Sequence, residues 1–231
     1  FNSVIHQHLT SDEAKLEERI ARLSDRLKAM VADHDRPNNS LEARTSLLVI
    51  EVNQAALKKD PQRLSSLWPQ FSEVIKQANG LGEFAAERLT RMIEVFGNVA
   101  GKDQGYTRLV DDVAAFVSER TGEAQGALVL LRRAQQLDFE DNFEMIRLLG
   151  KAARQLTKKE YADALIETMQ LLTLAYRSAG LLWAARASCI FAMASIFIEA
   201  EEDSDLPASI VPTVMMLAWI AVELRHLPDS L

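Results

Sequence analysis

The sequence predicts an all-α protein, and two observations support this prediction. Apolar residues recur at helical spacings, and no segment shows the sustained alternation of apolar and polar residues that is typical of strands. Glycine and proline are scarce, with nine and six in 231 residues, and lie at intervals that separate helices rather than hairpins. We therefore expect about ten helices of roughly 15 to 20 residues, joined by short loops and packed as antiparallel neighbours.

The first predicted helix covers residues 11–33 and carries a regular apolar pattern. Thr10 and Glu13 have the spacing of a capping box, which satisfies the free amides of a first turn. Along the helix, apolar residues follow alternating steps of four and three, as in a heptad seam. We favour packing of this seam on the next helix of the same chain, with a short dimeric coil as the alternative. The seam comprises Leu16, Ile20, Leu23, Leu27 and Met30.

Breaks in the sequence delimit nine further helices. The segment around Pro37 interrupts the pattern, so we expect an N-terminal helical segment over residues 1–36 and one continuous array over residues 37–231. Pro61 follows Asp60 and suits the first position of a helix. The predicted helices cover residues 40–59, 61–79, 82–99, 106–120, 123–137, 141–156, 158–178, 181–200 and 207–226.

Capping signals mark several of these boundaries. Asp141 and Glu144 repeat the capping-box spacing before the seventh helix, and Thr157 and Glu160 repeat it before the eighth. Gly180 ends the eighth helix, because glycine favours the position just after a helix. The ninth and tenth helices are apolar almost all round, so we expect them to be central helices with neighbours on several sides.

Three segments combine large apolar residues with small ones at a turn's spacing, often followed by small residues on the next helix. Small residues let two helix backbones approach, and large ones fill the groove between them. Gly97 and Gly150 are the small residues of the first two sets. The sets are Ile93, Phe96, Gly97 and Ala100; Ile146, Leu149, Gly150 and Ala153, with Ala162 and Ile166; and Met169, Leu172, Thr173 and Tyr176, with Ala185, Cys189 and Ala192.

This pattern resembles the tetratricopeptide repeat, in degenerate form, over residues 85–200. The distance from Gly97 to Gly150 exceeds the family's 34-residue period. The second and third sets also share the eighth helix, which leaves the pairing of helices open. The resemblance implies a right-handed α-solenoid of antiparallel helix hairpins, with a concave surface that binds a peptide or partner protein and has no catalytic activity.

Composition argues against several functional classes. A net charge of −7 makes nucleic acid an unlikely partner, because such binders are normally basic. Neither of the two most apolar segments is a convincing membrane span. Residues 181–198 are interrupted by Arg186, and residues 211–222 are fewer than the ~20 that a membrane span needs.

The N-terminus lacks the features of a signal peptide, so we expect a cytoplasmic protein. Because the chain begins with Phe1, we expect a fragment of a longer protein or a processed start.

The sequence offers no catalytic or metal-binding motif. Phosphate-binding loops, dinucleotide fingerprints, zinc-protease motifs and nucleophile elbows are all missing. His6 and His8 are close together but fall in a terminal segment, and Glu223 with His226 is the lone ExxH pair, whereas helical di-metal sites need two. Cys189 lies among apolar residues, as a buried small side chain would. We therefore predict no enzyme activity and no cofactor.

A stripe of cations runs from the seventh predicted helix into the turn after it and is a candidate ligand or partner site. Arg147, Lys151, Arg154 and Lys158 recur at helical spacing, and Arg132 and Arg133 on the preceding helix are expected to stand beside them. Such a stripe would hold an acidic peptide, a nucleic-acid backbone or an anionic ligand. The alternative is an ordinary solvated face.

The last helix is a candidate interface. Met215, Met216, Trp219 and Ile220 place apolar side chains on more than one side, whereas a terminal repeat normally has a polar outer face. We predict that Trp219 is buried in an intramolecular or intersubunit contact. A homodimer through the first or last helix is the corresponding expectation for assembly.

Taken together, these features predict a non-catalytic protein–protein interaction scaffold, the helical-repeat domain of a larger, multidomain bacterial protein. Its partner would be a protein or peptide. The alternative is a ligand-sensing regulatory domain that binds an anionic peptide, nucleotide or small molecule on a basic concave face. A deep basic pocket would favour the sensor, and a shallow groove would favour the scaffold.

Overall fold

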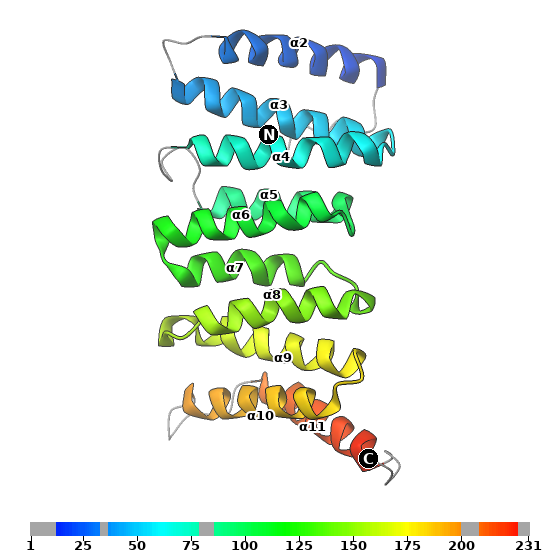
Figure 1. Ribbon diagram of the computed structural model, residues 1–231, viewed down its shortest axis with the longest axis vertical. Helices are drawn as coiled ribbons and strands as arrows, with labels where there is room; N and C mark the ends of the chain where they lie inside the picture. Colours follow the sequence, from blue (N-terminus) through cyan, green and yellow to red (C-terminus); the bar gives the residue numbers. More distant parts are fainter. Residues whose placement is uncertain (1–12, 33–36, 79–85, 200–207, 226–231) are drawn as a thin grey trace. The chain divides into compact units, whose positions relative to one another are not determined.

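The computed structural model describes residues 13–32, 37–78, 86–199 and 208–225 (Figure 1). These residues form ten α-helices, two short 3-10 helices and no strand, which confirms the predicted all-α class. The helices are α2 (Glu13–Val31), α3 (Pro37–Leu57), α4 (Pro61–Gln77), α5 (Ala86–Ala100), α6 (Gln104–Thr121), α7 (Glu123–Ala134), η1 (Phe139–Asp141), α8 (Asn142–Gln155), η2 (Lys159–Tyr161), α9 (Ala162–Ser178), α10 (Leu182–Glu199) and α11 (Ile210–Arg225).

Each predicted helix corresponds to one observed α-helix, but the predicted caps differ in outcome. Asp60 caps α4 as expected, since its Oδ1 accepts the backbone N–H of Arg63 at 2.9 Å, and Pro61 is the first helical residue. The capping boxes predicted at Asp141 and Thr157 are wrong. Helices α8 and α9 are entered through 3-10 turns, and the residue before each makes no side-chain cap bond. Thr10 lies outside the described residues.

The chain divides into two compact units. The first comprises Phe1–Ala85 with Asp103–Leu109, and the second comprises Ala86–Lys102 with Val110–Leu231. Helix α6 therefore begins in the first unit and continues into the second. The boundary expected at residue 36 falls inside the first unit.

In the first unit the heptad seam of α2 packs on α3. Leu27 of α2 is buried with Ala43 and Ile50 of α3, and Ile20 and Leu23 pack against them. The middle of the seam therefore packs on the next helix of the same chain, as favoured, while the side chain of Leu16 lies outside the described residues. Met30 departs from the pattern, since 43% of it is exposed.

A second buried group in this unit surrounds Trp68. Trp68 and Phe71 of α4 are fully buried, as is Tyr106 at the start of α6. The rings of Trp68 and Tyr106 meet edge to face with centroids 5.2 Å apart. Such pairs stabilise a core beyond the area they bury.

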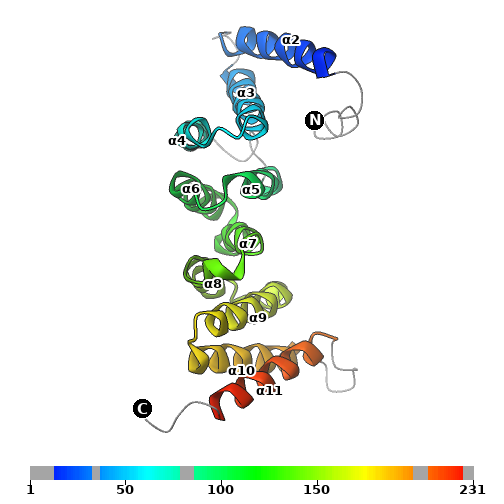
Figure 2. The ribbon, with the colours of Figure 1, turned by 90° about the vertical axis from the view of Figure 1, so that its right-hand side faces the viewer.

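In the second unit, helices consecutive in sequence pack on one another from α7 to α11 (Figure 2). Helix α5 also packs on α7. Helix α9 contacts both α8 and α10, so the two apolar sets that share α9 belong to one continuous series of packed helices. No helix in the described parts of the chain combines the length and hydropathy that a membrane span requires.

Two glycines of this unit lie where a side chain would collide with its neighbours. A Cβ on Gly97 of α5 would collide with the side-chain amide of Gln136, which follows α7, so this glycine makes room for a side chain rather than for a second helix backbone. A Cβ on Gly126 of α7 would lie 2.6 Å from the carbonyl oxygen of Ala114 in α6. The corresponding prediction for Gly150 is wrong, because a Cβ there would meet nothing within 4 Å.

Candidate protein interface

The predicted cation stripe is largely neutralised by carboxylates. The Arg147 guanidinium donates two hydrogen bonds of 2.7 Å to Glu144 and further bonds of 3.0 and 3.1 Å to Asp111 on α6. Lys151 donates to the same Asp111 at 3.0 Å. The hydrogen bonds with Glu144, and then those with Asp111, raise the pKa of Arg147 above its ordinary value. Two of the expected ligand-binding cations therefore serve as ties between α8 and its neighbour.

The prediction that Arg133 stands beside the cation stripe on the surface is wrong. It is 3% exposed, and its guanidinium donates to the carbonyl oxygens of Gly97 at 3.4 Å and Gly101 at 2.6 Å. The last carbonyls of a helix lack partners within that helix. Arg133 therefore satisfies the end of α5 from the helix packed against it.

The other three cations lie apart from this cluster. Arg132 pairs with Glu94 of α5 at 3.6 Å, and Lys158 lies 4.0 Å from Glu160. Arg154 is exposed and forms no ion pair with any residue that the structure describes. With four of the six cations paired and one buried, the stripe does not present a continuous basic surface.

A double substitution tests whether Arg147 and Lys151 bind anions once their carboxylate partners are removed. Replacing Asp111 with asparagine and Glu144 with glutamine removes the carboxylates that hold Arg147 and Lys151, so we expect tighter retention of the double variant on a heparin column than of the wild type. Glu18→Gln with Glu87→Gln is the matched control, since it makes the same charge change at two scattered, exposed pairs. Equal retention of the two double variants would show that Arg147 and Lys151 do not form an anion-binding site even without Asp111 and Glu144.

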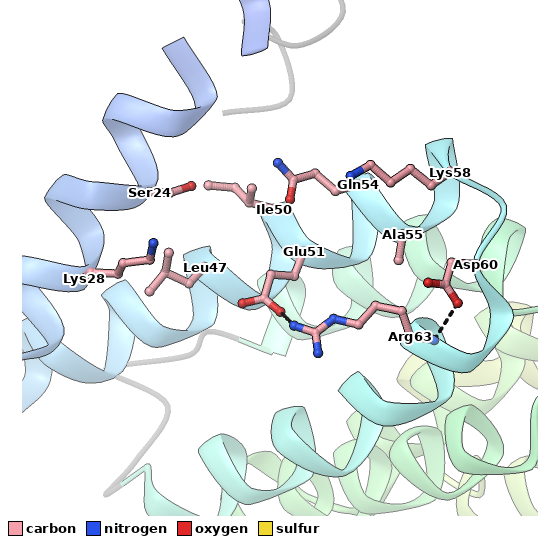
Figure 3. Close-up of a pocket in the computed structure, with 10 residues that line it drawn as sticks. All are labelled: Ser24, Lys28, Leu47, Ile50, Glu51, Gln54, Ala55, Lys58, Asp60 and Arg63. Atoms are coloured by element: carbon pink, nitrogen blue, oxygen red, sulfur yellow. Dashed lines mark hydrogen bonds and ion pairs between the residues drawn. The ribbon is translucent and has the colours of Figure 1, made fainter. Parts of the chain in front are cut away.

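Sequence reasoning missed an open groove in the first unit, because its lining comes from three helices (Figure 3). Its volume is about 310 Å³. The charges in it are of both signs, and Arg63 pairs there with Glu51, while Asp60 caps α4. The groove therefore shows no concentration of one charge and no catalytic arrangement. It is lined by Ser24, Lys28, Leu47, Ile50, Glu51, Gln54, Ala55, Lys58, Asp60 and Arg63.

The predicted interface residues of α11 lie on two sides of the helix. Ile220 is fully buried, and Met216 packs with it against Ala185 and Cys189 of α10. Met215 and Trp219 point away from this contact, and each is 60% exposed. The prediction that the chain's own contacts bury Trp219 is therefore wrong.

Trp219 is exposed because α11 has a second apolar side, opposite the one that packs on α10. Five of its exposed residues fall within one side of a helix with 3.6 residues per turn. The guanidinium of Arg177 lies 5.1 Å from the Trp219 ring centroid and also pairs with Glu223. We call this surface the α11 face: Val211, Val214, Met215, Trp219 and Val222.

Helix α10 also exposes an apolar side, contrary to the expectation that it is central. Its buried residues, among them Ala185, Cys189 and Ile196, lie on one side, and large apolar residues occupy the other. From these exposed fractions the α11 face presents roughly 500 Å² and the α10 residues roughly 600 Å² of apolar surface, comparable with the largest patch on a typical monomer. We call this second surface the α10 face: Trp183, Ile190, Phe191, Phe197 and Ile198.

No protein-family model matches the chain, and no curated protein matches it in sequence. Among solved structures, the chain is similar to the crystal structure of BtubC (BKLC) from P. vanneervenii, over 93% of this chain and 85% of that one. The sequence identity is 15% and the TM-score is 0.46. The function is therefore argued from the chain's own surfaces.

Proposed function

We propose that the chain is a non-catalytic protein-interaction scaffold, a tetratricopeptide-like array of antiparallel helix hairpins whose α11 face docks a partner protein. The observation that carries this proposal is the exposure of Met215, Trp219 and Val222 on a helix whose opposite side is already packed. Support for a repeat array comes from the consecutive packing of helices in the second unit.

The partner is best described as an amphipathic helix. A single helix laid on the α11 face would cover its apolar residues by the same side-to-side packing that α11 makes with α10. The charged groups beside the face are Arg225, which is exposed, and Arg177 in its pair with Glu223. A partner helix with carboxylates flanking its apolar stripe would place one of them near Arg225.

The other candidate functions have less support. A sensor of anions needs free cations, but Arg147 and Lys151 are held by Asp111 and Glu144. An enzyme would need an activated nucleophile. Burial raises the pKa of the Cys189 thiol, which donates to the carbonyl oxygen of Thr213 at 3.2 Å. A thiol kept protonated in this way is a poor nucleophile.

Site-specific photo-crosslinking in the native host tests the proposal. A photoreactive phenylalanine analogue at Trp219 or Met215 should give a covalent adduct with one protein, and the analogue at Leu57, which is 74% exposed in the other unit, should not. The adduct would be identified, and the partner purified for binding measurements. We expect Trp219→Glu to weaken its binding at least tenfold. Adducts at the α11 positions no stronger than at Leu57 would overturn the proposal.

A further inference from the structure

The α10 face contains a straight line of exposed apolar residues. Their positions follow steps of four and three, the spacing that aligns residues along one side of a helix in contact with another helix. Large and small side chains alternate along this line. In order the residues are Trp183, Ala187, Ile190, Ala194 and Phe197, all exposed.

This order of sizes is complementary to itself when two such helices run antiparallel. In one register Trp183 faces Ala194 of the partner subunit, and Ala187 faces Ile190 of the partner subunit. Trp183 and Ile190 then each meet a small side chain, which is the arrangement that lets two apolar layers interdigitate. In this register each a position of one helix lies opposite a d position of the other, as in antiparallel helix pairs.

The flank of the line extends this fit. In the same register Phe191, which is 51% exposed, lies against Ala184 of the partner subunit. Arg186 is the single charged residue between Leu182 and Ile198, and its guanidinium already lies over its own Trp183 ring at 5.8 Å. No like charges therefore have to be buried opposite each other.

The exposed area suits a stable dimer. The five large residues of the α10 face present roughly 600 Å² of apolar surface before the alanines and the rim are included. A standard interface buries about 800 Å² on each partner. Two-fold dimers are the commonest closed assemblies, and they require a surface that fits itself. A foreign helix would require no such self-complementary order of sizes.

We infer that the α10 face is a two-fold interface between two copies of this chain, with the α10 helices antiparallel. This assembly goes beyond the proposed function, since it uses α10 and leaves the α11 face for a different protein.

Sedimentation velocity of the purified 231-residue chain tests the inference. The wild type should sediment as a dimer, and Ile190→Glu should raise the dimer dissociation constant at least twentyfold, because each carboxylate would be forced against an apolar layer. Ile190 is 44% exposed within the chain, so this change should leave the helical circular dichroism intact. Val222→Glu on the α11 face and Leu57→Glu in the other unit are matched controls that should remain dimeric.

The register is tested by mixing two complementary variants. Ile190→Glu and Ala187→Lys should each be monomeric alone, and an equimolar mixture should form a heterodimer, because the new carboxylate faces the new ammonium group. A wild-type chain that stays monomeric at high concentration, or an Ile190→Glu chain that remains dimeric, would overturn the inference. A mixture that stays monomeric would overturn the register. None of these outcomes bears on the adducts expected at Trp219.

Discussion

Replacing Arg133 with alanine is expected to lower the free energy of unfolding by about 3 kcal/mol, because a buried donor group is lost. The guanidinium holds the carbonyl oxygens of Gly97 and Gly101, and the side chain is almost fully enclosed. Without it, the carbonyl oxygen of Gly97, which is buried, loses a partner inside the packed contact between α5 and α7, whereas the carbonyl oxygen of Gly101 belongs to an exposed residue. Urea denaturation followed by circular dichroism measures the effect.

The neighbouring residue provides the control. Arg132 is exposed and makes a longer pair with Glu94, so Arg132→Ala should cost less than about 0.5 kcal/mol. Both changes replace an arginine on the same helix with the same residue, so helix propensity cancels between them. Similar losses in the two variants would mean that the bonds from Arg133 to α5 contribute little.

Replacing Gly126 with alanine is expected to destabilise the chain by about 2 kcal/mol, because the new methyl group overpacks a tight contact. The Cβ would lie 2.6 Å from the backbone carbonyl oxygen of Ala114 and 2.8 Å from Cβ of Ser118. Backbone cannot move aside as a flexible side chain can, so α6 and α7 must separate. Thermal unfolding followed by circular dichroism would show a lower Tm.

Gly150→Ala tests the same substitution where space is open. Nothing lies within 4 Å of a Cβ there, and alanine favours a helix interior over glycine by about 1 kcal/mol. The variant should therefore be more stable than the wild type. Opposite signs at Gly126 and Gly150 are the expected result, and a loss at both positions would show that glycine at Gly150 has a role that the packing does not reveal.

Local patterns in the sequence predicted the helices well, because helix periodicity and breaks such as Asp60-Pro61 depend on neighbouring residues. The same patterns failed wherever the outcome depends on which helix lies opposite. Arg132 and Arg133 are adjacent and chemically identical, yet only Arg133 points at the end of α5. Gly97 and Gly150 occupy similar places in the repeat pattern, but only at Gly97 would a Cβ collide with a neighbouring side chain.

The candidate site shows the same division. The sequence identified α11 as apolar on more than one side, but periodicity alone did not show which side α10 covers. The structure places Ile220 inside and Trp219 outside. The pairing of Arg147 and Lys151 with Asp111 joins residues far apart in the sequence, and no local signal indicated it.

The enclosure of Cys189 has a practical consequence for studying this protein. It is the single cysteine in the sequence, it is inaccessible to solvent, and burial raises the pKa of its thiol. Maleimide reagents react with thiolate at accessible positions, so the natural chain should be almost inert to them. A cysteine introduced at any exposed position would then accept a fluorophore or spin label selectively, without first removing the native one.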